Sequence, residues 1–116
     1  MTPENPSGFT LWAVWRRDLA ARGPVDTTGL ADAVASVEAG GVVVRGLYDV
    51  SGLRADADLM VWLTGETAEA LQSALRVLRR VPAIAALLPT WNALGVHREA
   101  EFSRAHAPSF LRGLPP

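Results

Sequence analysis

The sequence predicts an α+β fold in which four antiparallel strands form a sheet and two helices cover one of its faces. Two observations lead to this class. Strand-like and helix-like segments follow one another in the order strand, helix, strand, strand, helix, strand. The two middle strands are joined by a short link that contains glycine, as in a β-hairpin. This order is typical of the ferredoxin-like fold, in which both helices pack on the same side of the sheet.

The strand predictions rest on runs rich in aromatic and branched residues. FTLWAVWRR (9–17) has bulky side chains on both faces, so we expect it at the centre of the sheet. VVVRGLYDV (42–50) and ADLMVWLTG (57–65) are expected to pair as a hairpin across a six-residue connection. TWNALGVH (90–97) is the candidate for the last strand.

The first helix is predicted to start near Asp26, with Asp26 or Thr27 as its N-cap, and to end at Gly40–Gly41. The second is predicted over 66–80, with Thr64 as its cap. Each predicted helix has apolar residues at the spacings of three and four that indicate a buried stripe. They are Leu30, Ala33, Val34 and Val37 in the first helix, and Leu71, Ala74, Leu75 and Leu78 in the second.

The second helix is expected to close at Pro82, because proline cannot continue a helix. AIAALL then forms one or two further helical turns that stop at Pro89.

Length and composition indicate one ordinary globular domain. The chain has 116 residues, of which 49% are hydrophobic and 20% charged. We expect a flexible N-terminus over 1–8, a ferredoxin-like domain over 9–98 and an extended C-terminal tail over 99–116.

Charge and cysteine content argue against several classes of function. The net charge is -1, and no run of arginines is longer than two, so we expect no nucleic-acid partner. The absence of cysteine excludes disulfides and thiol chemistry. The first residues lack the features of a secretion signal, and VPAIAALLP is too short to cross a bilayer. A cytoplasmic protein without a membrane span is the prediction.

The helices cover one face of the sheet, yet bulky apolar side chains occur on both. The apolar side chains that the helices would not all cover include those of Trp12, Val14, Met60 and Trp62. A large exposed apolar face is a liability in a monomer, so we expect a further layer to cover it. A second copy of the sheet, packed face to face as a dimer or as half of an αβ-barrel, is the simplest cover.

Charged residues gather around the hairpin: Asp49, Asp56 and Asp58 with Arg45 and Arg54. A metal site or an acid/base role is one interpretation. We prefer pairing of these charges across the hairpin.

Aromatic and histidine side chains are the other candidates for a site. The tryptophans at 12, 15, 62 and 91 could form a ligand cage, but on strands they are more typical of a core or an interface. His97 is expected to make a structural hydrogen bond. Since no metal-ligand frame and no G-x-S-x-G motif occurs, neither a protein-only metal site nor a serine triad is predicted.

Four stretches of the chain resemble, in the same order, the N-terminal half of the chlorite dismutase superfamily. They are FTLWAVWR, VVVRGLYDVSGLRADADLMVWL, AEALQSALRVLRR and HREAEFSRAHAPSFLRG. The actinobacterial coproheme decarboxylases are the members most similar to them. The resemblance runs from Phe9 to about Gly113. It implies subunits made of two ferredoxin-like halves packed sheet on sheet, and assembly of these subunits into oligomers.

The resemblance also implies a reaction. With peroxide, such enzymes oxidatively decarboxylate two propionates of iron coproporphyrin to vinyl groups and so form haem b. In such enzymes iron coproporphyrin is both substrate and redox cofactor. The isolated chain could also bind no cofactor. The partner implied is the chain itself or a C-terminal half.

One functional residue of the family carries over. His106 in RAH matches the distal-side histidine of the RSH type, whose role is to help deprotonate peroxide. The family's catalytic tyrosine lies in a strand just after this tail, and its proximal histidine lies further on. This sequence contains neither, and Tyr48 does not match the catalytic tyrosine.

Three interpretations therefore stay open. The chain is a piece of a coproheme decarboxylase, or a stand-alone dimeric ferredoxin-like module with a binding or structural role and no haem catalysis. The third is a small dimeric monooxygenase of the antibiotic-biosynthesis type, which turnover of a phenolic substrate without haem would support.

Overall fold

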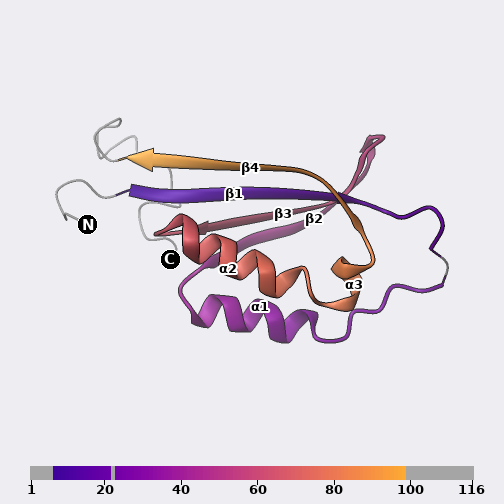
Figure 1. Cartoon of the computed structure of the whole chain (residues 1–116), viewed down its shortest axis with the longest axis horizontal. Helices are drawn as coiled ribbons and strands as arrows, with labels where there is room; N and C mark the ends of the chain where they lie inside the picture. The colour runs from indigo at the N-terminus through magenta and orange to yellow at the C-terminus, as the bar shows by residue number, and fades with distance from the viewer. Residues whose placement is uncertain (1–6, 22, 99–116) are drawn as a thin grey trace.

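The computed structural model describes residues 7–21 and 23–98, and these form one sheet with helices on one side of it (Figure 1). The elements in chain order are β1 Ser7–Arg16, α1 Leu30–Ala39, β2 Val43–Arg54, β3 Ala57–Gly65, α2 Ala68–Leu78, α3 Pro82–Ala85 and β4 Leu88–Arg98. The predicted ferredoxin-like fold is confirmed. The predicted termini, 1–8 and 99–116, lie almost wholly outside the described residues.

The sheet has the order β2-β3-β1-β4, and every neighbouring pair is antiparallel. The segment over 9–17 is therefore central, as its two bulky faces predicted. Trp12 lies opposite Trp62, and Val14 lies opposite Met60 on one side and Trp91 on the other. Since side chains alternate along a strand, this register places these aromatic and aliphatic groups on one face.

The core lies between the other face of the sheet and the two longer helices. The predicted stripes supply Ala33 and Val37 from α1, and Leu71, Ala74 and Leu78 from α2, all of them buried. The residues that form this core are Leu11, Ala13, Trp15, Ala33, Val37, Val42, Val61, Leu63, Leu71, Ala74, Leu78, Val81 and Ile84. Trp15 is thus a core residue, whereas the other three tryptophans lie on the opposite face.

The glycine end predicted for the first helix is confirmed, with Gly40 as the C-cap of α1, whereas both predicted N-caps were wrong by a few residues. The N-cap of α1 is Gly29, whose φ of 79° is left-handed, whereas Asp26 accepts a hydrogen bond from the Thr28 N–H in a turn before the helix. The N-cap of α2 is Thr67, whose hydroxyl accepts from the Ala70 N–H at 3.0 Å. Thr64 is buried in β3, so its side chain is not available as a cap.

The hairpin and the last strand also differ from the prediction. β2 continues to Arg54, so two residues rather than six separate it from β3. Pro82 begins α3 instead of only ending α2, because the first turn of a helix needs no N–H from proline. Pro89 lies inside β4, where the pairing with β1 shifts register. An edge strand tolerates proline at such a point.

No helix within the described ranges is long and apolar enough to cross a membrane.

Candidate functional site on the open face of the sheet

The face of the sheet opposite α1 and α2, here called the open face, has an aromatic centre. The Trp12 and Trp62 rings are stacked with centroids 6.1 Å apart and an angle of 17° between their planes. The Trp62 indole N–H donates to the Thr10 hydroxyl at 2.7 Å. The guanidinium carbon of Arg45 lies 5.4 Å from the centroid of the Trp62 ring. Trp62 thus packs against Trp12, Thr10 and Arg45, and the two stacked rings are here called the Trp12–Trp62 platform.

The edges of the open face carry aromatic side chains as well. Trp91 on β4 is 56% exposed and Tyr48 on β2 is 38% exposed. The Tyr48 ring lies above Gly46, so close that a Cβ on Gly46 would collide with the ring. Glycine at this position is therefore explained by close approach of a side chain rather than by an unusual backbone.

This contact gives a first prediction. Gly46→Ala is expected to displace the Tyr48 ring and to lower the free energy of unfolding by about 1 kcal/mol through overpacking. In a Tyr48→Ala background the same change is expected to be neutral or slightly stabilising, because alanine suits a strand better than glycine. Unfolding free energies of the four proteins in a double-mutant cycle measure the coupling. Equal costs of Gly46→Ala in both backgrounds would contradict the contact.

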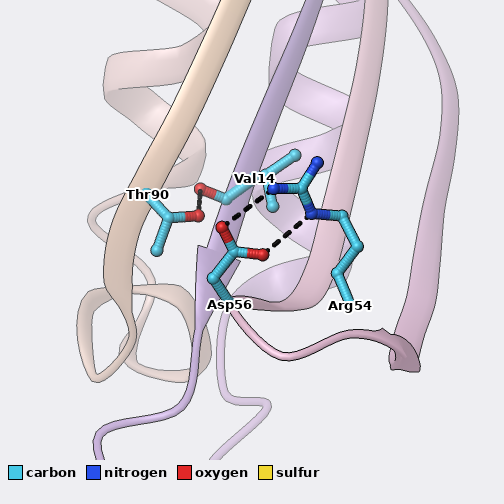
Figure 2. Close-up of polar contacts among 4 residues, drawn as sticks. All are labelled: Val14, Arg54, Asp56 and Thr90. Atoms are coloured by element: carbon cyan, nitrogen blue, oxygen red, sulfur yellow. Dashed lines mark hydrogen bonds and ion pairs between the residues drawn. The ribbon is translucent and has the colours of Figure 1, made fainter.

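The charges around the hairpin pair with one another or with nearby backbone. Arg54 donates to both carboxylate oxygens of Asp56, at 2.9 and 3.1 Å (Figure 2). Asp58 accepts from the Arg17 N–H at 2.7 Å, and Asp49 accepts from the Ser51 N–H at 2.9 Å. The predicted charge pairing at the hairpin is confirmed for Arg54 and Asp56, whereas Arg45 lies over Trp62.

The ion pair makes a pH-dependent prediction. The hydrogen bonds from Arg54 hold the pKa of the Asp56 carboxyl below its ordinary value of 3.8. Because the folded pKa is lowered, the pair's contribution is present above pH 3.8 and is lost as the pH falls through the folded pKa. Arg54→Gln is expected to raise the Asp56 pKa toward 3.8, which carboxyl ¹³C shifts in an NMR titration measure.

Asp49 is the internal control for that titration, because the Ser51 side chain and N–H, not an arginine, lower its pKa. The Asp49 pKa is expected to stay unchanged in the Arg54→Gln protein. An Asp56 pKa that also stays unchanged would mean that the ion pair does not form in solution.

The two histidines and the hairpin carboxylates are the remaining candidate site residues. His97 lies on β4 opposite Gly8, half-buried at the end of the open face. His106 lies outside the described residues. Within 7–21 and 23–98, no group of three or more histidine, cysteine, aspartate or glutamate side chains could hold a metal ion. Asp49, Asp56 and Asp58 instead accept the hydrogen bonds from Ser51, Arg54 and Arg17 described above.

A hollow of about 240 Å³ opens at the hairpin end of the open face. Val14, Met60 and Trp91 belong to the sheet, and Val50 and Leu53 belong to the end of β2. Figure 1 shows this end of the hairpin bending away from the helices, toward the open face. The sequence placed Leu53 in a loop, so the hollow was not predicted. The one sequence feature that indicates it is Gly52, which has a φ of 87° in the interval where β2 leaves its regular pairing with β3.

Fold and site together define a class: a ferredoxin-like α+β domain whose bare aromatic sheet face is suited to packing against a second layer. Comparison with known proteins gives the family. The sequence model described as chlorite dismutase matches residues 26–116. The chain belongs to the chlorite dismutase family.

Comparisons with individual relatives support the same family. The chain is 52% identical over 77 residues to a protein named coproheme decarboxylase from Mycolicibacterium smegmatis, a match that covers 66% of this chain and 33% of that protein. Chlorite dismutase from Candidatus Nitrospira defluvii, solved in complex with imidazole, has a TM-score of 0.60 at 20% identity. A putative chlorite dismutase has a TM-score of 0.65 at 14% identity. At these identities the two structures show the shared fold.

The chain spans only part of these relatives. The two structural matches cover 93% and 94% of this chain, but 44% and 53% of the solved chains. Each of those chains therefore contains about one further stretch of similar length.

Proposed function

We propose that this chain is part of a coproheme decarboxylase. The proposed reaction of the whole protein is the peroxide-dependent oxidative decarboxylation of iron coproporphyrin to haem b. The observation that carries the proposal is the 52% identity over 77 residues with the coproheme decarboxylase of Mycolicibacterium smegmatis. Because the match covers 33% of that protein, the proposed activity belongs to an assembly larger than the described residues. We place that assembly in the cytoplasm.

Four hollows among the described residues are each small for an iron porphyrin. Hollows on this part of the molecule hold about 210–350 Å³. Sites for drug-sized ligands measure about 300–1,000 Å³, and an iron tetrapyrrole with four propionates is at least that large. The haem pocket of the proposed reaction must therefore include further residues, from a C-terminal half or from a second copy.

His106 is the residue that we propose as the base on the distal side. A neutral imidazole can accept a proton from peroxide near pH 7, because its ordinary pKa lies just below that pH. This role is supported by the match of RAH to the family's distal motif, within the range 26–116 that the family's sequence model covers.

Titration of the purified chain with iron coproporphyrin, followed at the Soret band, is the first test. A saturable shift would support binding of the tetrapyrrole by this chain, and peroxide-driven loss of carboxylates would then test the reaction. Absence of a shift at substantial excess would mean that this chain alone does not bind the substrate.

The two histidines supply a matched pair of variants. In a protein that converts iron coproporphyrin, His106→Gln is expected to lower the rate with peroxide by roughly 100- to 10,000-fold, the usual contribution of a general base. His97→Gln is the control, expected to leave the rate within a few-fold. Rates measured from pH 5 to 8 should show the loss of the basic group for His106→Gln alone. Equal effects of both changes would contradict the assignment.

A second candidate function has its own support in the open face. A stand-alone chain that packs sheet to sheet with another copy would cover Trp12, Trp62 and Trp91, and would act as a binding or structural module without haem catalysis. A dimer that shows no Soret shift would favour this function over the decarboxylase.

A further inference from the structure

A groove runs along the helix side of the sheet between α2 and the edge strand β4, and it is here called the α2–β4 groove. α2 packs on β1 and β3. On the same side of the sheet, Leu94 of β4 lies opposite the core residue Leu11 and is 55% exposed. The groove therefore has open apolar surface on the side of the sheet away from the open face.

Two adjoining pockets make up the groove, and they share Leu75 and Asn92. The first holds about 350 Å³, and its lining includes Leu11, Leu71 and Leu94. The second holds about 210 Å³ and lies where the chain passes from α2 through α3 to β4 (Figure 1). A ligand that occupies both would have the room of an ordinary small-molecule site, about 300–1,000 Å³.

The second pocket has a buried indole in its lining. Trp15 is 5% exposed, and among the described residues its indole N–H has no hydrogen-bond partner. Every fully buried polar side-chain atom in that part of the chain is partnered, so the Trp15 N–H must reach open space. The pocket beside α3 is the one that Trp15 lines, so the N–H is directed into it. Because buried polar groups are nearly always hydrogen-bonded, an N–H left open in this way suits an acceptor from a ligand.

Two more donors line the same pocket. Arg79, the C-cap residue of α2, contributes a guanidinium, and Asn92 on β4 contributes a side-chain amide. Over 7–21 and 23–98, neither side chain makes a hydrogen bond or an ion pair. An arginine binds a carboxylate through two parallel hydrogen bonds, and indole and amide N–H groups can add further bonds. Three donors around one pocket, one of them cationic, favour an anionic group.

The charges along the groove allow a ligand one orientation. Glu69 lines the first pocket and Arg79 lines the second, about 15 Å apart along α2 at a rise of 1.5 Å per residue. A carboxylate beside Glu69 would be repelled, whereas a carboxylate beside Arg79 would be attracted. The anionic end of a ligand therefore belongs in the second pocket, and its apolar part belongs in the first, against Leu11 and Leu94.

We propose that the α2–β4 groove binds a monocarboxylic acid with an apolar tail, of the chemical class of a medium-chain fatty acid. Arg79, the Trp15 N–H and the Asn92 amide hold the carboxylate, and the tail lies along Leu94. The groove is on the opposite side of the sheet from the open face. This site is therefore separate from whatever covers the open face and from the proposed reaction with iron coproporphyrin.

Titration of the ¹⁵N-labelled full chain with decanoate, below the concentration at which it forms micelles, tests the proposal. The Trp15 indole N–H signal is expected to move downfield and to saturate, because its proton gains a charged acceptor. Decanol has the tail without the charge, and acetate has the charge without the tail. Both are expected to bind at least about 10-fold more weakly than decanoate. Equal affinity for decanol would overturn the carboxylate site, and an unmoved Trp15 signal with decanoate would overturn the whole proposal.

Arg79→Gln and Arg80→Gln are a matched pair of variants. Both arginines are exposed at the end of α2, but Arg79 lines the second pocket and Arg80 does not. Arg79→Gln is expected to raise the dissociation constant of decanoate by at least about 10-fold, the effect of losing a hydrogen bond to a charged group. Arg80→Gln is expected to leave it unchanged. Equal dissociation constants in wild type and both variants would overturn the role of Arg79, whereas the Soret titration bears only on the decarboxylase.

Discussion

Replacing Leu63 with alanine is expected to lower the free energy of unfolding by about 2–5 kcal/mol, the range found for buried leucines. Leu63 is fully buried in β3, opposite Leu11 on β1 and Val44 on β2. It belongs to the cluster that joins the sheet to Leu71 and Leu78 of α2. Because small domains are stable by only about 5–15 kcal/mol, this one change removes a large share of the total.

Chemical denaturation followed by far-ultraviolet circular dichroism measures the effect, with a lower midpoint and an unchanged slope expected. Leu94→Ala is the matched control, because Leu94 lies opposite Leu11 on the edge strand β4 and is 55% exposed. Its cost is expected to be within about 0.5 kcal/mol. Similar costs at both positions would mean that the core does not lie between β3 and α2.

The order of elements and the two faces of the sheet could be predicted because burial leaves a period in the sequence. Leu11, Ala13 and Trp15 alternate with Trp12 and Val14 along β1, and the two sets lie on opposite faces in the structure. The buried faces of the helices could be predicted for the same reason, since spacings of three and four bring side chains onto one side of a helix. Patterns of this kind report packing directly.

Element ends could not be predicted, because several nearby residues offer the same local chemistry. Asp26, Thr27 and Gly29 can all begin a helix, and Thr64 and Thr67 can both cap one. The choice is made by the sheet: β3 extends through Thr64 and buries it, which leaves Thr67 as the first threonine free to cap α2.

The site was predicted in part for a similar reason. The open face followed from strand periodicity, and Trp12 and Trp62 were placed on it. The Arg45 contact with Trp62 and the Tyr48 contact with Gly46 depend on a register shift between Val44 and Gly46, which no local pattern indicates. The hollow depends on a bent strand whose residues also suit a loop. His106 remains a prediction, because it lies outside the described residues.

Trp91 is expected to be the strongest single contributor to association through the open face. It is the most exposed tryptophan of the described residues, at 56%, and it borders the hollow. Tryptophans that combine a large apolar area with little loss of side-chain freedom dominate binding energy at interfaces. Trp91→Ala is therefore expected to weaken self-association by about 2 kcal/mol, or about 30-fold in dissociation constant, while the monomer stays folded.

Leu94→Ala serves again as the comparison, because Leu94 is on the same strand with almost the same exposure but on the helix side of the sheet, beside α2. Sedimentation equilibrium of both variants therefore tests which side of the sheet is covered by the partner. The two positions lie on the same strand and are almost equally exposed, so the side of the sheet is the main difference between them. A larger loss for Trp91→Ala assigns the interface to the open face. A larger loss for Leu94→Ala would move the interface to the edge between β4 and α2. The Trp12–Trp62 platform would then need another explanation for its exposure.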